Sequence, residues 1–446
     1  MVSTSHSKAS VKAHHPLYFR DYRYYALARL FVTLGQFSMM IVIGWQTYST
    51  ARLTMDTHSA AAQLGFIGLA QFIPVFLLSP FSGWLSDHYD RRRVIMFAVS
   101  IQFLSALILG YATAADTISL PVLFSTAVLL GIARCFSGPA FGSMVPRLVP
   151  RETMPGAVAF GSMIWQSAMI VGPALGGYVF AALDWGPYAL AGTLFLVTLL
   201  AVWKIKPLPP LTSSEGARQS QRQILGQIWD GVRYVHSNRL VLGAITLDLM
   251  AVLLAGSTAL LPIYARDVFH VGAQGLGEMA AAPGIGAALT ALIFGMRPPQ
   301  NNVGNKMLIA VGVFGGATII FGLTAFMPDS INQQVAMAAL FTCGVADMFS
   351  VFVRQTLIQI YTPDEMRGRV ASFSLIAISA SNELGEAESG FLAAAIGPVI
   401  AVVAGGVGAI ITVILWARLF PEIGQARRFD AIVEPTDHST SQEIKQ

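Results

Sequence analysis

The chain has 446 residues, of which 54% are hydrophobic and only 12% charged, with a mean hydropathy of +0.61 and a formal net charge of +4. No soluble core of this length needs so much apolar surface, so the composition excludes an ordinary soluble domain. The sequence has no phosphate-binding loop, nucleophile elbow, dinucleotide fingerprint, metal-ligand spacing or basic stripe with interleaved aromatic residues. We therefore expect no enzyme activity, no catalytic residue, no cofactor or metal, and no nucleic-acid partner.

Twelve long apolar runs, separated by short loops, fill most of the chain. A helix needs about 20 such residues to cross the hydrocarbon core of a bilayer. Backbone polar groups in lipid must be hydrogen-bonded within their own element, and the alternation of barrel strands is absent, so an all-α membrane protein with twelve transmembrane helices is predicted. The predicted spans are 24–48, 62–84, 94–115, 120–143, 157–182, 186–205, 239–263, 274–296, 306–327, 333–356, 368–394 and 397–419.

Lysine and arginine are distributed very unevenly between the two sides of these spans. We assign 24 of the 28 to the N-terminal tail, the even-numbered loops and the C-terminal tail. Arg52 and Arg266 lie in odd-numbered loops, and Arg29 and Arg134 lie within spans. Cytoplasmic loops collect lysine and arginine, so both termini of this multi-pass protein are expected on the cytoplasmic side of a bacterial inner membrane.

The spans divide into two sets of six around a polar, proline-rich segment. We expect an N-terminal cytoplasmic tail at 1–23, a first six-helix bundle at 24–205, a cytoplasmic linker at 206–238, a second bundle at 239–419 and a C-terminal cytoplasmic tail at 420–446. Apolar residues at helical spacing predict an amphipathic helix in the linker: Ile224, Ile228, Val232 and Val235. This helix ties the bundles together, or it is a plain spacer.

The two sets of spans share a weak internal repeat. Residues 154–177 align with residues 366–390 with one gap, which places GPALGG over GEAESG. A parallel repeat of six plus six helices is a known transporter architecture with its site between the halves. The first copy is a candidate helix-packing motif with small residues for close contact and a proline that favours a kink: Gly172, Pro173, Gly176 and Gly177. Ordinary tight packing is the alternative.

A short charged loop, GWLSDHYDRRRV at 83–94, joins the second and third spans. Gly83 permits a close backbone approach, and Asp87 is placed to cap a neighbouring helix N-terminus or to pair with an arginine. Arg91 and Arg92 hold the loop on the cytoplasmic side, and simple positive-inside anchoring explains them equally well.

This loop resembles the signature of the major facilitator superfamily, Gly-x-Leu-Ala-Asp-Arg-x-Gly-Arg-Arg, from which it departs at His88 and Asp90. The run RCFSGPA from Arg134 is similar to the family's Arg-x-x-x-Gly motif, and GPALGG resembles the glycine–proline signature of drug–proton antiporters. Three stretches resemble the bacterial exporter branch with the enterobactin exporter and macrolide-efflux proteins: residues 247–269, 347–370 and 381–390. The resemblance covers roughly residues 16–420.

The resemblance implies two six-helix bundles around a central cavity that is lined by the first, fourth, seventh and tenth helices. It also implies alternating access, in which the cavity opens first to one side of the membrane and then to the other. The loop that holds Asp87 would lie against the start of the eleventh helix. There Arg367 and Arg369 would help to latch the cytoplasmic ends together while the cavity faces outward.

Charged residues inside the spans are functional candidates, because each costs roughly 2.5–3.5 kcal/mol at a helix centre. The first half supplies bases and the second half acids, which makes these residues candidates for proton coupling: Arg134, Asp248, Asp347, Glu383 and Glu386. Helical rise places Arg134, Asp347 and Glu383 near the midplane. Glu383 or Asp347 is the preferred proton carrier, since desolvation favours a protonated carboxylate. Fixed helix-packing pairs are the alternative.

Polar and aromatic residues on the same helices suit an amphipathic substrate. The cavity candidates are Arg29, Gln36, Trp45, Gln46, Tyr48, Gln71 and Gln166. Interfacial positions are the alternative for Trp45, Tyr48 and Arg29. We therefore predict a monomeric secondary transporter in the lipid bilayer that exports a siderophore-like or drug-like small molecule in exchange for protons. A solute–proton importer and a non-transporting receptor are the alternatives.

Overall fold

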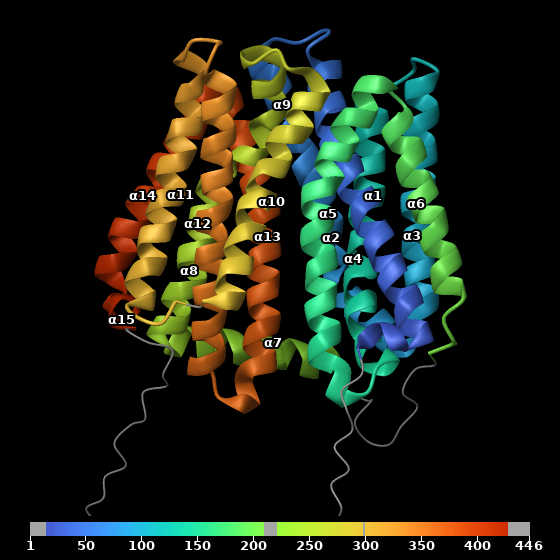
Figure 1. The fold of residues 1–446 in the computed structure, drawn as a ribbon, viewed down its shortest axis with the longest axis vertical. Coiled ribbons are helices and arrows are strands. Elements are labelled where there is room, and N and C mark those ends of the chain that lie inside the picture. The colour runs from blue at the N-terminus through green and yellow to red at the C-terminus, as the bar shows by residue number, and fades with distance from the viewer. Residues whose placement is uncertain (1–14, 209–220, 298, 427–446) are drawn as a thin grey trace, which may run out of the picture.

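The computed structural model describes residues 15–208, 221–297 and 299–426, and every regular element in these ranges is helical. Figure 1 shows the long helices running roughly parallel in two groups, one on each side of the molecule. The described part of the chain contains eleven helices that are long and apolar enough to cross a membrane. The twelfth long helix, α13 (Asp364–Ile396), carries four glutamates and completes the predicted set. The all-α membrane fold with two six-helix bundles is thus confirmed.

The first half consists of six long helices, each of which covers one predicted span. They are α1 (Arg20–Ala51), α2 (Thr57–His88), α3 (Arg91–Ala114), α4 (Leu120–Leu148), α5 (Met154–Ala182) and α6 (Gly186–Trp203). Side-chain caps mark two of the starts, since Asp56 accepts a hydrogen bond from the backbone N–H of Ser59 and Asp90 from that of Arg92. One apolar core of residues from all six helices holds this half together.

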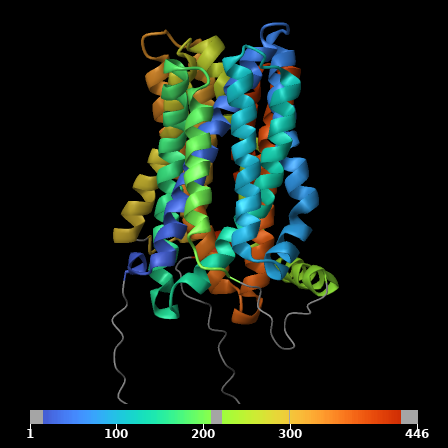
Figure 2. The same ribbon diagram turned by 90° about the vertical axis from the view of Figure 1, so that its right-hand side faces the viewer.

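The second half begins with α7 (Gln221–Ser237) and α8 (Arg239–Leu254). Its remaining helices are α9 (Leu261–Ile263), α10 (Gly272–Met296), α11 (Val303–Leu323), α12 (Asn332–Tyr361), α13, α14 (Pro398–Leu419) and α15 (Pro421–Gln425). The start of α1 and the end of α14 lie at the same end of the molecule, which we call the terminal end. The opposite end is called the distal end. The helix α7 lies across the terminal end, where it packs on α8 and α13 (Figures 1 and 2).

The seventh predicted span, 239–263, is not one continuous helix. After α8 the chain breaks at Gly256, continues through a 3-10 turn at Ser257–Leu260 and the short α9, and ends in a π-helical turn at Tyr264–Val268. A Cβ atom at Gly256 would lie 2.6 Å from the carbonyl oxygen of Gly385, so α13 crosses directly over the break. The apolar composition did not reveal it. Irregular backbone at membrane depth is tolerated when it is buried in protein, as here.

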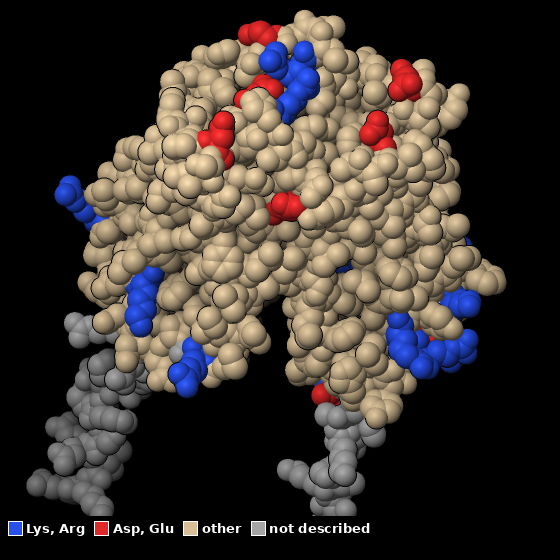
Figure 3. All heavy atoms as spheres, turned by 45° about the horizontal axis from the view of Figure 1, so that its top comes forward, with Lys and Arg blue, Asp and Glu red and all other residues tan. Residues whose placement is uncertain are grey.

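The two halves meet through two helix pairs, α5 against α10 and α2 against α13. At the distal end both halves also contribute to one apolar cluster, in which Tyr48 and Leu64 pack with Leu261 and Tyr264. Figure 3 shows that a hollow separates the halves at the terminal end, whereas the distal end is closed. The structure therefore has one closed and one open end, as in the states of alternating access that are open to one side of the membrane.

Candidate functional site

An ion pair joins the two halves near the middle of their helices. Arg134 is the fifteenth of the 29 residues of α4, and its Nη2 lies 2.5 Å from Oε1 of Glu383 on α13. Its Nη1 donates a second, longer hydrogen bond of 3.4 Å to Gln71 on α2. The Glu383 side chain is only 10% exposed and that of Arg134 is 38% exposed, so the pair borders the space between the halves. The structure thus brings together one base and one acid of the predicted coupling set.

A second buried ion pair lies entirely within the second half. Asp248 on α8 accepts a hydrogen bond from Nη1 of Arg354 on α12, and both side chains are less than a tenth exposed. The sequence analysis missed Arg354, because that residue lies near the end of a predicted span and was counted with the adjacent loop; this assignment is wrong. Asp347 lies two helical turns earlier on α12, within the electrostatic reach of both residues, and makes no hydrogen bond or ion pair with any described residue.

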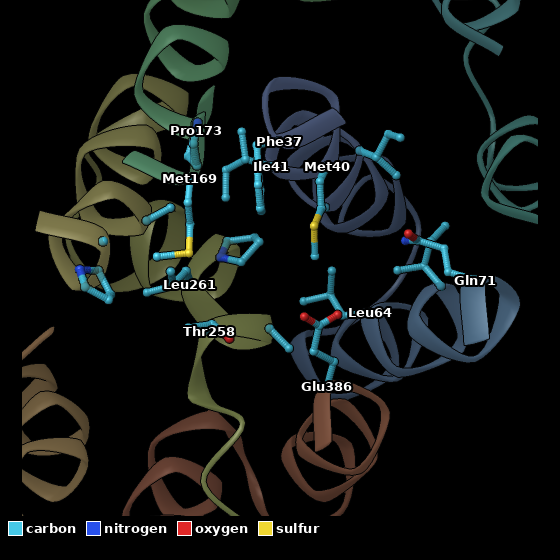
Figure 4. A pocket seen from close by; sticks show the side chains of 18 residues that line it. Phe37, Met40, Ile41, Leu64, Gln71, Met169, Pro173, Thr258, Leu261 and Glu386 are labelled. Carbon is cyan, nitrogen blue, oxygen red and sulfur yellow. The ribbon is translucent and has the colours of Figure 1, made fainter. Parts of the chain in front are cut away.

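A central cavity of about 310 Å³ lies between the halves. Figure 4 shows side chains from both halves converging on it, with Phe37, Met40 and Ile41 of α1 facing Leu261 and Glu386. The lining comes from α1, α2 and α5 on one side and from the broken seventh span, α10 and α13 on the other. No residue of the fourth or tenth span, which the resemblance placed at the cavity, is among its lining residues.

Two of the predicted cavity glutamines bond within the first half instead. Gln36 donates a hydrogen bond of 3.1 Å to Gln102 on α3. Gln46 donates to Thr113 at 3.1 Å and accepts a 2.5 Å hydrogen bond from the Tyr188 hydroxyl. These bonds satisfy buried polar groups and fix α1 to α3 and α6. Among the predicted polar cavity residues, Gln71 does line the central cavity.

The remaining predicted cavity residues also lie outside that lining. Trp45 borders a separate cavity near the distal end, and Gln166 is a half-buried residue of α5. The Arg29 guanidinium lies between two aromatic rings, 5.3 Å from the centroid of Phe141 and 5.5 Å from that of Trp165. Such cation–π contacts stabilise a charge inside the bundle without an acid, so Arg29 does not extend to the interface.

A cluster of polar contacts, the distal latch, closes the distal end. Asp267 of the second half accepts a hydrogen bond of 2.5 Å from the Tyr48 hydroxyl and one of 3.3 Å from Nε of Arg52, both in the first half. Arg266 donates in the opposite direction, to the backbone oxygen of Ser49 at 2.9 Å. The sequence analysis did not identify this latch. The signal was present, however, because Arg52 and Arg266 are the two basic residues assigned to odd-numbered loops.

At the terminal end, three of the predicted gate arginines, Arg92, Arg367 and Arg369, each bind within their own half. The surroundings of Gly83 and the side chain of Asp87 lie outside the part of the chain that the structure describes. Arg92 donates to the backbone oxygen of Ile205 at 2.7 Å and thereby ties the start of α3 to the end of α6. Its neighbour Arg91 also has a partner within the structure.

The two arginines at the start of α13 bind within the second half. Arg367 donates a hydrogen bond of 2.9 Å to the backbone oxygen of Gln359, and Arg369 forms an ion pair of 3.1 Å with Asp230 of α7. The predicted apolar face of α7 is described only at Val232 and Val235, of which Val235 is buried against α8, α12 and α13. Ile224 and Ile228 lie outside the described side chains. Arg369 therefore links α7 to the start of α13 in this state.

The GPALGG motif divides its contacts between two neighbours of α5. Gly172 and Gly176 both face α1. A Cβ atom added at Gly172 would lie 2.6 Å from Cβ of Phe37, and one added at Gly176 would lie against the backbone of Ser38. Gly177 instead faces α10, with the position of its Cβ 3.0 Å from Cα of Gly277. Pro173 lines the central cavity. The motif therefore packs α5 both within its own half and against the other half.

Comparison with known proteins agrees with this architecture. The family profile described as a transmembrane secretion effector matches residues 11–444. The chain is 26% identical over 404 residues to the enterobactin exporter EntS of Citrobacter koseri, covering 89% of this chain and 92% of that protein. It is also 26% identical over 412 residues to the enterobactin exporter EntS of Escherichia coli strain UTI89, covering 91% and 95%.

Solved structures show the same fold at low sequence identity. A crystal structure of the nucleoside transporter NupG superposes with a TM-score of 0.68 at 13% identity, covering 90% of this chain and all of that one. An inward-facing, occupied structure of a bacterial homologue of the human lysosomal transporter Spinster superposes with a TM-score of 0.66 at 15% identity, covering 91% and 98%.

Proposed function

Because the chain belongs to the major facilitator superfamily, among its transmembrane secretion effectors, it is a membrane transporter, and we propose that it exports an amphipathic small molecule in exchange for protons. The observation that carries this proposal is the Arg134–Glu383 ion pair, since it links the two halves through an acid that a single proton neutralises. The relatives named as enterobactin exporters support the outward direction and a siderophore-like or drug-like cargo.

The distribution of charge supports a cytoplasmic position for the terminal end. Most of the basic residues lie in the two tails, or in the loops and the adjoining helix ends at that end, as expected for cytoplasmic segments of a bacterial inner-membrane protein. The open hollow then faces the cytoplasm and the distal latch closes the periplasmic side. In this assignment the structure corresponds to the inward-facing state, ready to take up cargo from the cytoplasm.

The coupled proton acts on the link between the halves. An ionised Glu383 attracts Arg134 through a charge-assisted hydrogen bond, which is about twice as strong as a neutral one. A protonated Glu383 loses that attraction and leaves Arg134 free to reorient. A ligand shifts a conformational equilibrium only by its differential affinity for the two states, and the making and breaking of this pair gives the proton such a difference. In the outward-facing state Glu383 takes up a proton from the periplasm, and it releases this proton to the cytoplasm in the inward-facing state. Each outward passage of cargo is thereby exchanged for the entry of protons.

The cytoplasmic gate closes through an exchange of partners in this scheme. Arg369, which pairs with Asp230 of α7 in the structure, moves to Asp87 when the terminal ends come together, and Arg367 supports it. The glycine at position 83 lets the two backbones approach. Asp87→Asn should therefore reduce export while the protein reaches the membrane at its normal level. Undiminished export by that variant would remove the gate from the mechanism.

Transport in vesicles with an imposed pH gradient tests the coupling. Inside-out vesicles with an acidic lumen should accumulate enterobactin or a lipophilic drug, and Glu383→Gln should abolish this uptake because glutamine cannot bind the proton. The same variant should retain cargo-for-cargo exchange without a gradient, since that reaction needs no proton. Glu388→Gln, on the same helix, is the matched control and should behave as the wild type.

The outcomes separate the alternatives. Gradient-driven uptake that survives in Glu383→Gln would refute the role of the ion pair. Accumulation only in right-side-out vesicles with an acidic exterior would identify a solute–proton importer. A protein that moves none of these compounds under either gradient would contradict the transport of such amphipathic cargo.

A further inference from the structure

The wall of the central cavity has one charge and very few polar groups. Of its 18 lining residues, Glu386 is the one with an ionisable side chain, and Gln71 and Thr258 are the others that can form side-chain hydrogen bonds. The remaining lining residues are apolar, among them Met40 of α1 and Met169 of α5. A wall of this kind binds an apolar body and orients it through a single charged contact.

Among the described residues, Glu386 is not directly paired with another side chain, although Glu383 and Arg134 lie within electrostatic reach of it. In the described part of the chain its carboxylate makes no hydrogen bond or ion pair, and Figure 4 shows it pointing toward the cavity beside Leu64. Glu383 lies one turn away on the same face of α13, and the Arg134 guanidinium forms its ion pair with Glu383. One positive and two negative charges leave a net charge of −1 when all three groups are ionised, and the unpaired carboxylate is the one at the cavity wall.

A carboxylate in such a setting discriminates strongly by charge. An apolar cargo that fills the cavity displaces water from the wall, so its electrostatic interaction with the carboxylate is much stronger than in bulk solvent. Like charges in contact across a binding surface are rejected, whereas an opposite charge is attracted and held in register. The methionine side chains adapt to irregular aromatic or aliphatic shapes and do not demand one particular ligand.

We propose, building on the proposed transport function, that the cargo is a cationic amphipath whose apolar body fills this cavity and whose positive group contacts Glu386. An ammonium, guanidinium or phosphonium centre on an aromatic or aliphatic body fits the chemistry of the wall. Gln71 and Thr258 supply hydrogen bonds to a polar substituent. The two neighbouring glutamates of α13 then have different roles, since Glu383 binds the coupled proton and Glu386 contacts the positive group of the cargo.

An anionic cargo would require a different contact. The cation nearest to the cavity is Arg134, which bonds to Gln71 and Glu383 and is not part of the lining. An anion bound there would have to displace Glu383 and would place its body beside the unpaired carboxylate of Glu386. The structure therefore favours a positive cargo, and anion binding is the outcome that would contradict the proposal.

Two probes of equal shape and opposite charge test the proposal directly. Tetraphenylphosphonium and tetraphenylborate each carry four phenyl rings around one charged centre. Equilibrium binding of each radiolabelled probe is measured to the purified full-length protein in lipid nanodiscs, without a gradient, after subtraction of binding to empty nanodiscs. The wild type should bind the cation and not the anion. Glu386→Gln should weaken cation binding by at least about tenfold.

Matched variants separate the charge from the fold. Glu386→Asp keeps the charge and should restore most of the affinity, and Glu388→Gln, which lies outside the lining, should bind the cation as the wild type does. Thermal unfolding midpoints close to that of the wild type show that each variant is folded. The proposal is overturned if Glu386→Gln binds the cation with unchanged affinity, or if the wild type binds the anion equally well or better.

The two experiments fail independently of each other. If Glu386→Gln loses cation binding while Glu383→Gln keeps gradient-driven transport, the cargo class stands and the proposed coupling is wrong. If Glu383→Gln loses gradient-driven transport while Glu386→Gln binds the cation normally, the coupling stands and the cargo class is wrong.

Discussion

The distal latch tests which end of the molecule opens. Asp267→Asn keeps the size of the side chain and removes its charge. In the structure this carboxylate accepts hydrogen bonds from the Tyr48 hydroxyl at 2.5 Å and from Nε of Arg52 at 3.3 Å. Both donors belong to the first half and Asp267 to the second, so the substitution weakens contacts that exist only while the distal end is closed.

The size of the effect follows from these contacts. A hydrogen bond to a charged group contributes about 1.5–3 kcal/mol to stability. The Arg52 side chain is 28% exposed, so its ion pair is screened by solvent and adds at most about 1 kcal/mol. Asparagine still offers an acceptor to Tyr48, which leaves a net loss of about 1–2 kcal/mol, equivalent to a shift of about 5–30-fold toward the distally open state.

Thiol labelling in intact cells measures that shift. A single cysteine replaces Met40 in the wall of the central cavity, and alanine replaces the two native cysteines, Cys135 and Cys343, both of which are buried. A membrane-impermeant maleimide reaches the new cysteine from outside only when the distal end opens. Asp267→Asn should therefore increase the labelling rate by about 5–30-fold.

Two further variants test whether the change in labelling rate comes from the latch itself. Tyr48→Phe removes the donor of the shorter hydrogen bond, and in the Asp267→Asn background it should add little, because the two residues act on one contact. Asp184→Asn, an exposed aspartate of an odd-numbered loop, is the matched control and should leave the rate unchanged. An unchanged rate in Asp267→Asn would show that the latch does not hold the distal end closed.

Three other substitutions test packing, the buried pair and a helix cap. Gly177→Ala forces a Cβ atom against α10 and should lower the thermal unfolding midpoint and increase labelling from outside, whereas unchanged values would show that the crossing is loose. Asp248→Asn leaves Arg354 buried without its counter-charge and should cost about 3–5 kcal/mol in denaturant unfolding, while the doubly neutral Asp248→Asn/Arg354→Gln variant recovers most of this stability. The Ser59 contacts lower the pKa of Asp56, so the stability that this cap contributes is present above the usual pKa of aspartate and is lost in acid. Asp56→Asn should make the unfolding midpoint less dependent on pH between about pH 3 and about pH 6, and an unchanged dependence would exclude this cap as its source.

The number and position of the helices followed from composition, because lipid leaves the backbone no other regular form than a helix or a closed barrel. The break in the seventh span did not follow. Gly256 reads as one small residue in an apolar run, and its role depends on the backbone of Gly385, more than a hundred residues further along the chain. A sequence pattern reports local periodicity and carries no information about which distant backbone crosses it.

The sequence predicted which residues belong to the candidate site, but it did not predict which of them pair with one another. Burial cost identified Arg134, Glu383 and Asp248, because an ionised group in a span stands out against apolar neighbours. The pairing of Arg134 with Glu383 required the halves to be placed face to face. Arg354 was missed although it lies inside the predicted span 333–356, because a basic residue two positions from the end of a span was counted with the loop that follows.

The last aligned position of the internal repeat, residues 154–177 against 366–390, is a glycine at which the two halves are in contact. Gly177 packs against Gly277 of α10, and its counterpart Gly390 packs against Gly65 of α2, where a Cβ atom would lie 2.6 Å from the facing Cα. The repeat therefore places a glycine at both crossings between the halves. Contacts without side chains do not interlock, so we expect the halves to rotate about these two points as the structure changes state. Leucine at either glycine would separate the halves, and a doubly substituted protein with normal transport would show that the crossings are not the pivots.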